Sequence, residues 1–112
     1  IKIMGVRSGK NPKYNGWWKN LWKRWSIERM NKKAPLKILF SDDKTDYWKH
    51  YNNEKYAEVR VNKSVSPSAV MILGENVFIF TYDEVMSCVH IVSKPIALSF
   101  SGFFDSLWDI SK

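Results

Sequence analysis

Residues 95–110 read PIALSFSGFFDSLWDI, and this stretch decides how the rest of the chain must be arranged. On a helical projection one face collects the apolar side chains Ile96, Ala97, Phe100, Phe103, Phe104, Leu107 and Trp108. The opposite face carries Leu98, Gly102, Asp105 and Asp109. Each aromatic ring of the stripe can bury on the order of 150–250 Å². The helix therefore needs a wide apolar surface, such as the face of a β-sheet.

The start of this helix is marked by Pro95, which suits a first turn because its missing N–H has no helical partner there. Ser93 or Lys94 then takes the cap position. The runs that precede the helix are rich in Val, Ile and Phe, as strands are. They span residues 69–73, 77–81 and 88–92, with a turn at residues 74–76 that makes the first two a hairpin.

The earlier half of the chain predicts a different arrangement. Residues 1–6 and 36–40 have the composition of strands, and a helix over residues 17–31 connects them. A single helical connection favours parallel pairing of the two strands. A shorter helix over residues 45–53 and a strand over residues 56–61 follow. The fold class is therefore α/β, a mixed sheet with flanking helices.

Length and composition indicate one domain. The chain has 112 residues, of which 45% are hydrophobic and 15% aromatic, enough for one core and too few for two. Because the chain opens on Ile1 within a strand-like run, we expect a piece of a longer protein. No run reaches the ~18 apolar residues of a membrane span, and no signal peptide is visible. A cytoplasmic setting is the expectation.

Charge is distributed unevenly along the chain. Residues 1–65 carry 16 Lys/Arg against 6 Asp/Glu, whereas residues 66–112 carry 2 against 5. A basic half can indicate nucleic acid, an anionic ligand or only solubility. The candidate anion or nucleic-acid contacts are Lys10, Lys13, Lys19, Lys23 and Arg24. Lys32 and Lys33, which follow them in the sequence, are further candidates for contact with nucleic acid.

Four tryptophans mark the helix over residues 17–31. Trp17, Trp18, Trp22 and Trp25 share one face with Leu21, and Lys19, Asn20, Lys23 and Ser26 lie opposite. The simpler interpretation is that the tryptophans pack this helix onto a sheet or a second subunit. The alternative is a platform on which bases stack beside basic side chains. Exposure of Trp17 or Trp18 would favour the platform.

Cysteine and histidine give no sign of a metal or cofactor site. Cys88 is the only cysteine, so no internal disulfide forms, and its apolar run predicts a buried, structural side chain. His50 and His90 lack a Cys or carboxylate at ligand spacing. We therefore expect no metal ligands and no cofactor.

Residues 36–108 resemble the phospholipase-D-like regulatory domain of TrmB-type transcriptional regulators, archaeal and bacterial proteins that begin with a winged helix. The resemblance rests on LKILF, a Tyr-rich helix, EVRV and the run SPSAVMILGENVFIFTYDEVMSCVHIVSKPIALSFSGFFDSLW. Its fixed points are a strand ending in Arg60, the connector Ser66-Pro67, the hairpin, and a closing Phe-x-x-x-Trp at Phe104 and Trp108. WSIERMNKKAPLKILF, residues 25–40, matches more loosely.

The resemblance implies effector sensing, dimerisation and transcription control, with DNA bound through a domain upstream of Ile1. Phospholipase-D enzymes attack phosphorus with a His and hold its oxygens with a Lys. The matching positions here fall near Pro67, Ala69 and Gly74, which cannot perform that chemistry. We therefore expect no catalytic residue and no enzyme activity. The expected dimer or packing surface comprises Trp17, Trp18, Trp22, Phe103, Phe104 and Trp108.

Overall fold

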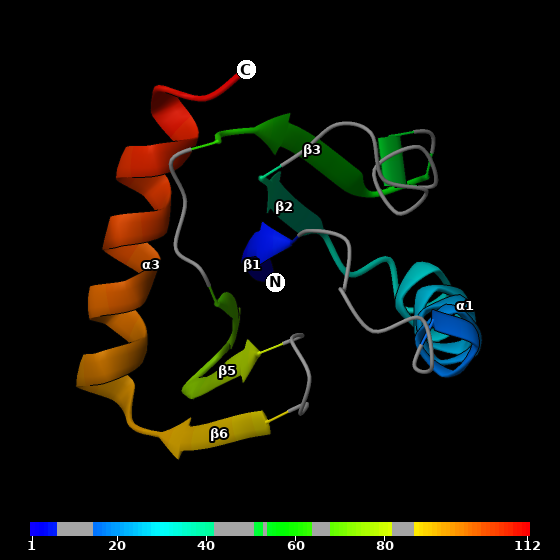
Figure 1. Cartoon of the computed structure of the whole chain (residues 1–112), viewed down its shortest axis with the longest axis horizontal. Helices are drawn as coiled ribbons and strands as arrows, with labels where there is room; N and C mark the ends of the chain where they lie inside the picture. The colour runs from blue at the N-terminus through cyan, green and yellow to red at the C-terminus, as the bar shows by residue number, and fades with distance from the viewer. Residues whose placement is uncertain (7–14, 42–50, 53, 64–67, 82–86) are drawn as a thin grey trace.

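A computed structural model describes residues 1–6, 15–41, 51–52, 54–63, 68–81 and 87–112, without the side chains of residues 15–19 and 22. Strands and helices alternate first, and a run of antiparallel strands follows (Figure 1). The elements are β1 Lys2–Val6, α1 Asn15–Asn31, β2 Leu36–Phe40, β3 Ala57–Val61, β4 Ala69–Leu73, β5 Asn76–Thr81, β6 Ser87–Val92 and α3 Lys94–Asp109.

Within the described residues, six strands form one mixed sheet in the order β3-β2-β1-β4-β5-β6. β1, β2 and β3 pair in parallel, whereas β4 is antiparallel to β1 and begins a fully antiparallel half. The expected α/β class, the parallel β1–α1–β2 unit and the antiparallel hairpin are thus confirmed. The strand order also separates the chain by charge, because β1 to β3 come from the basic residues 1–65 and β4 to β6 from the rest.

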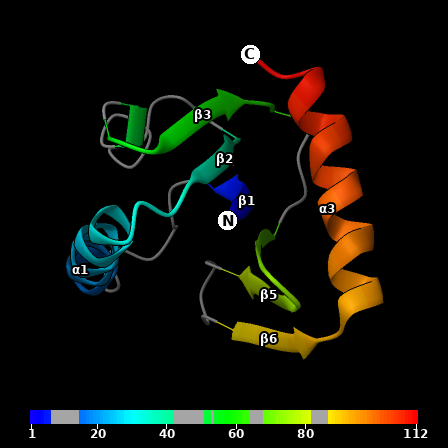
Figure 2. The same ribbon diagram turned by 180° about the vertical axis from the view of Figure 1, so that it is seen from behind.

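Two layers of side chains cover the sheet, one on each face, because successive residues of a strand point to opposite sides. On one face α3 packs over Met4, Leu39, Val70, Ile72 and Val77. On the other face Ile3, Leu36, Ile38 and Phe40 are buried together with Tyr51, and Trp25 of α1 packs against them. Figures 1 and 2 show α3 and α1 on opposite sides of the sheet.

The start of α3 follows the sequence prediction. Ser93 is the N-cap, and its hydroxyl accepts a hydrogen bond of 3.3 Å from the Ile96 N–H. Pro95 occupies the first turn. Ala97, Phe104 and Trp108 are buried beneath the helix, so the expectation that this helix lies on a sheet is confirmed.

Two glycines with positive φ shape the sheet. Gly5 (φ 78°) lies where the pairing of β1 with β2 shifts register, as expected at a β-bulge. Gly74 (φ 60°) and Glu75 connect Leu73 to Asn76 in a two-residue hairpin loop, the pattern of a type II′ turn. Most strand ends lie within one residue of the predicted ones. The predicted helix over residues 45–53 falls almost wholly outside the described residues.

Within the described residues, no helix has the length and apolar character needed to cross a membrane.

Candidate functional site

The closing helix α3 divides its aromatic residues between the core and the surface. Phe104 is fully buried and Trp108 is 6% exposed, whereas their neighbour Phe103 is 53% exposed. Three of the six residues expected on a packing or dimer surface belong to α3, and of these Phe104 and Trp108 pack inside the domain. Of these three, Phe103 alone is exposed enough to contact another molecule.

An apolar stripe continues along this exposed flank of α3. Ile96 and Ile110 lie seven residues before and after Phe103, and both are exposed. Phe100 and Leu107 lie between them and pack partly against the core. This flank of α3 is therefore a narrow apolar strip. Its middle residues, Phe100 and Leu107, pack partly against the domain's own core.

Arg60 joins β3 to α3. Its Nη1 donates a hydrogen bond of 2.7 Å to the Trp108 carbonyl, and its guanidinium carbon lies 4.6 Å from the centroid of the Trp108 ring. Lys37 approaches the same ring, with its Nζ 5.3 Å from the centroid. Cations over an indole face are attracted by its quadrupole. Trp108 is thus held by the core below it and by cations from β2 and β3.

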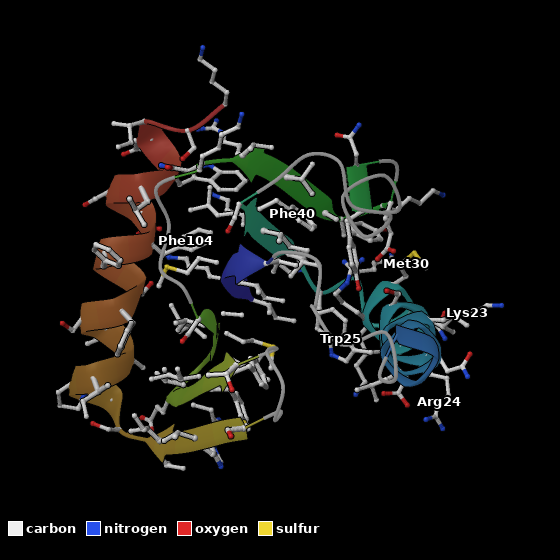
Figure 3. The ribbon with its side chains drawn as sticks, viewed as in Figure 1. Lys23, Arg24, Trp25, Met30, Phe40 and Phe104 are labelled. Carbon is white, nitrogen blue, oxygen red and sulfur yellow. The ribbon has the colours of Figure 1, made fainter. Side chains whose placement is uncertain are left out.

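The basic helix α1 presents two of the five candidate nucleic-acid contacts to solvent. Lys23 and Arg24 are exposed, and Figure 3 shows them pointing away from the sheet while Trp25 points toward it. Trp25 packs against the core, so it is not part of a stacking platform. The other candidates on and before this helix lie outside the described part of the chain. These are the residues Lys10 and Lys13 and the side chains of Lys19, Trp17, Trp18 and Trp22.

A buried charged pair fixes the other side of α1. The Arg29 side chain is 1% exposed and forms a salt bridge with the side chain of Glu54, which is 5% exposed. Arg29 Nη1 also donates to the carbonyls of Ala34 and Tyr56, at 3.0 and 3.2 Å. The network locks the end of α1 to the segment that enters β3, which is a structural role.

One prediction for this helix is wrong. The helical projection places Ser26 opposite the tryptophan face that is predicted to pack, yet Ser26 is 2% exposed and its hydroxyl is 3.2 Å from the Tyr51 hydroxyl. The buried face of α1 is turned toward Ser26 and Arg29, because these polar groups find partners in the segment before β3. Helical spacing alone could not show that such partners existed.

The antiparallel end of the sheet carries His90 and Cys88. The His90 ring stacks on Phe78 with centroids 4.3 Å apart, and its Nε2 is 2.9 Å from Asn76 Oδ1. Cys88 is exposed, so the prediction of a buried cysteine is wrong. The cause is topological, because Cys88 lies on the last strand of the sheet, where α3 covers only one face. Among the described residues no group of three metal-ligating side chains comes together.

Comparison with protein families, with curated proteins and with solved structures gives no match to this chain.

Proposed function

We propose that this chain is the regulatory part of a TrmB-type, DNA-binding transcription regulator, with a phospholipase-D-like fold and no chemistry of its own. The observation that carries the proposal is the contact between Arg60 and Trp108. These residues are two fixed points of the sequence resemblance, 48 positions apart. Their contact gives a physical reason for a strand-ending Arg and a closing Phe-x-x-x-Trp to occur together.

The surroundings of the positions that correspond to phospholipase-D catalysis support a non-catalytic role. Ala69 is fully buried and Gly74 forms a hairpin, so neither offers a nucleophile or a cation. His90 is at a different place in the sheet, stacked on Phe78. A chain of this kind acts by binding, and its partners would be a second copy of itself and a small-molecule effector, in the cytoplasm.

In this proposal DNA is contacted by a winged-helix domain that precedes Ile1 in the full protein. The test is a fluorescence anisotropy titration of these 112 residues against labelled duplex and single-stranded DNA at low and moderate salt. We expect no saturable binding at either salt concentration. Saturable binding that weakens steeply with salt would show phosphate contacts by the chain itself, and would contradict the proposal.

The second candidate function is direct nucleic-acid binding by the basic half, and the exposure of Lys23 and Arg24 favours it. If that function is correct, the double substitution Lys23→Glu and Arg24→Glu reduces both affinity and the salt slope. The matched control is Lys94→Glu on α3, because Lys94 is also exposed but belongs to the other half of the chain. Equal binding by all three proteins would exclude α1 as the contact.

A further inference from the structure

β6 ends the sheet with an unprotected edge. In the described part of the chain no strand pairs with its outer side, and both ribbon views place it at the margin of the molecule (Figures 1 and 2). Its sequence, Ser87–Val92 SCVHIV, contains no Lys, Arg, Asp, Glu or Pro. Proteins usually protect such edges with charge, proline or a covering segment, because a free edge pairs with other strands.

The opposite edge of the same sheet has that protection. β3 carries Glu58 and Arg60 within its five residues. The carbonyl of Val61, at its end, accepts a hydrogen bond of 3.3 Å from the Lys112 N–H. In the described part of the chain the two edges therefore differ, because the β6 edge has neither the charged residues nor the backbone contact found at β3.

The hydrogen-bond pattern identifies the groups that face outward. The Ser93 N–H donates to the Glu75 carbonyl at 3.0 Å, immediately after the pair of Asn76 with Val92. Hydrogen-bonded pairs alternate with non-bonded pairs along an antiparallel ladder. Cys88, His90 and Val92 therefore direct their N–H and C=O groups away from β5, toward the free edge.

We propose that the β6 edge pairs with the β6 edge of a second copy, antiparallel and centred on His90, to join two sheets into one. This inference rests on the dimerisation in the proposed function and names its contact. With His90 opposite its counterpart, Cys88 faces the second copy's Val92. All the outward backbone groups are then paired across the two-fold axis. A register centred one residue earlier would place Val92 opposite residue 86, beyond the end of β6.

Side chains in this register are compatible with a copy of the same strand. On the face away from α3, the cross-strand pairs are His with His and Cys with Val. On the α3 face Val89, which is 55% exposed, lies opposite the second copy's Ile91. No pair opposes two fixed like charges, which would be destabilising. An isologous contact of this kind closes as a dimer and does not extend into a filament.

The charge distribution is compatible with a second copy. The strands of the basic half begin at β1, three strand spacings from β6, roughly 14 Å at about 4.8 Å per strand. Joining two β6 edges places the basic halves at the far ends of the combined sheet. Their separation then exceeds the ~8 Å Debye length at physiological salt, so the net charge of each copy opposes the contact only weakly.

A disulfide trap tests the register. In Val92→Cys, the new thiol and the second copy's Cys88 would lie in a hydrogen-bonded pair with Cα atoms about 5.5 Å apart, within the range of a disulfide. Mild oxidation should convert most of the protein to a covalent dimer on a non-reducing gel. Two control variants, Cys88→Ser with Val92→Cys and Leu73→Cys at an exposed site on β4, should form no covalent dimer on the same gel. Equal cross-linking in all three variants would overturn the register.

Charge substitution at the centre of the contact tests the pairing itself. His90→Lys and His90→Glu each place like charges opposite one another, and each should raise the dimer dissociation constant at least tenfold in sedimentation equilibrium. An equimolar mixture of the two should restore association. The control is Phe103→Lys on the exposed flank of α3, which should leave the dissociation constant within about twofold of the unmodified chain. Circular dichroism verifies that each variant is folded.

The outcomes separate this inference from the proposed function. If the unmodified chain dimerises, Phe103→Lys abolishes the dimer and the His90 variants do not, then α3 is the contact. The β6 inference is then overturned and the proposed function remains. If the chain binds an extended peptide at β6 but not a second copy, the inference is also overturned. A chain that is monomeric at every concentration contradicts both.

Discussion

The guanidinium carbon of Arg60 lies 4.6 Å from the centroid of the Trp108 ring, and the same side chain donates a 2.7 Å hydrogen bond to the Trp108 carbonyl. This contact holds the last turn of α3 against the last-but-one residue of β3. A charged hydrogen bond contributes about 1.5–3 kcal/mol, and a cation over an aromatic ring about 0.5–2 kcal/mol.

Arg60→Ala should therefore lower the free energy of unfolding by about 2–5 kcal/mol, the sum of those two contributions. Urea denaturation followed by tryptophan fluorescence measures the loss. Glu58→Ala is the control, because Glu58 is an exposed charge on the same strand. Equal losses in the two variants would contradict the role given to Arg60.

Phe104 and Phe103 form a matched pair for testing how α3 packs. Phe104 is fully buried, so Phe104→Ala leaves a cavity and should cost about 3–5 kcal/mol of unfolding free energy. Phe103 is 53% exposed, and Phe103→Ala should cost less than about 1 kcal/mol. Thermal and urea unfolding of the two variants measure these two losses of unfolding free energy. A larger loss for Phe103→Ala would mean that the helix is rotated about its axis.

Two ion pairs in the described part of the chain should behave differently when one partner is removed. Glu54→Ala leaves the buried Arg29 guanidinium without its counter-ion and should cost about 3–5 kcal/mol. Asp105→Ala breaks the exposed 2.8 Å pair with Lys2 and should cost less than about 1 kcal/mol. Urea unfolding at low and high salt distinguishes them, because salt weakens only the exposed pair. Similar losses and similar salt dependence would contradict the burial of Glu54.

Lys33, which follows α1, has a φ of 53°, a conformation that side chains with a Cβ adopt at a cost. Lys33→Gly removes that strain and should stabilise the fold by about 0.5–1 kcal/mol. Lys32→Gly, one residue earlier at a position without positive φ, should be neutral or destabilising. Differential scanning calorimetry compares the two, and destabilisation by Lys33→Gly would show that the strain is absent.

The sequence was sufficient for features that depend on local periodicity and capping. Ser93 and Pro95 located the start of α3 within one residue, and the apolar stripe correctly assigned Phe104 and Trp108 to packing. Alternating Val, Ile and Phe located β4, β5 and β6, because a half-buried strand needs that composition. These features follow from contacts within one element and its immediate neighbours.

Features that depend on distant partners were not predictable. A helical projection gives an apolar arc but not its centre, so it did not separate buried Phe104 from exposed Phe103. Ser26 and Arg29 are buried only because Tyr51 and Glu54 supply polar partners. Cys88 lies in an apolar run that predicts a buried side chain, but the sheet order places its strand at an edge. The β6 edge itself is a property of topology, which no local pattern encodes.

The most direct test of the account is sedimentation equilibrium of the 112-residue chain over a range of concentrations from low to several hundred micromolar. The account predicts a reversible, concentration-dependent increase from 13.2 kDa to twice that mass, weakened by His90→Lys. A constant mass of 13.2 kDa at every concentration would contradict a self-associating regulatory domain.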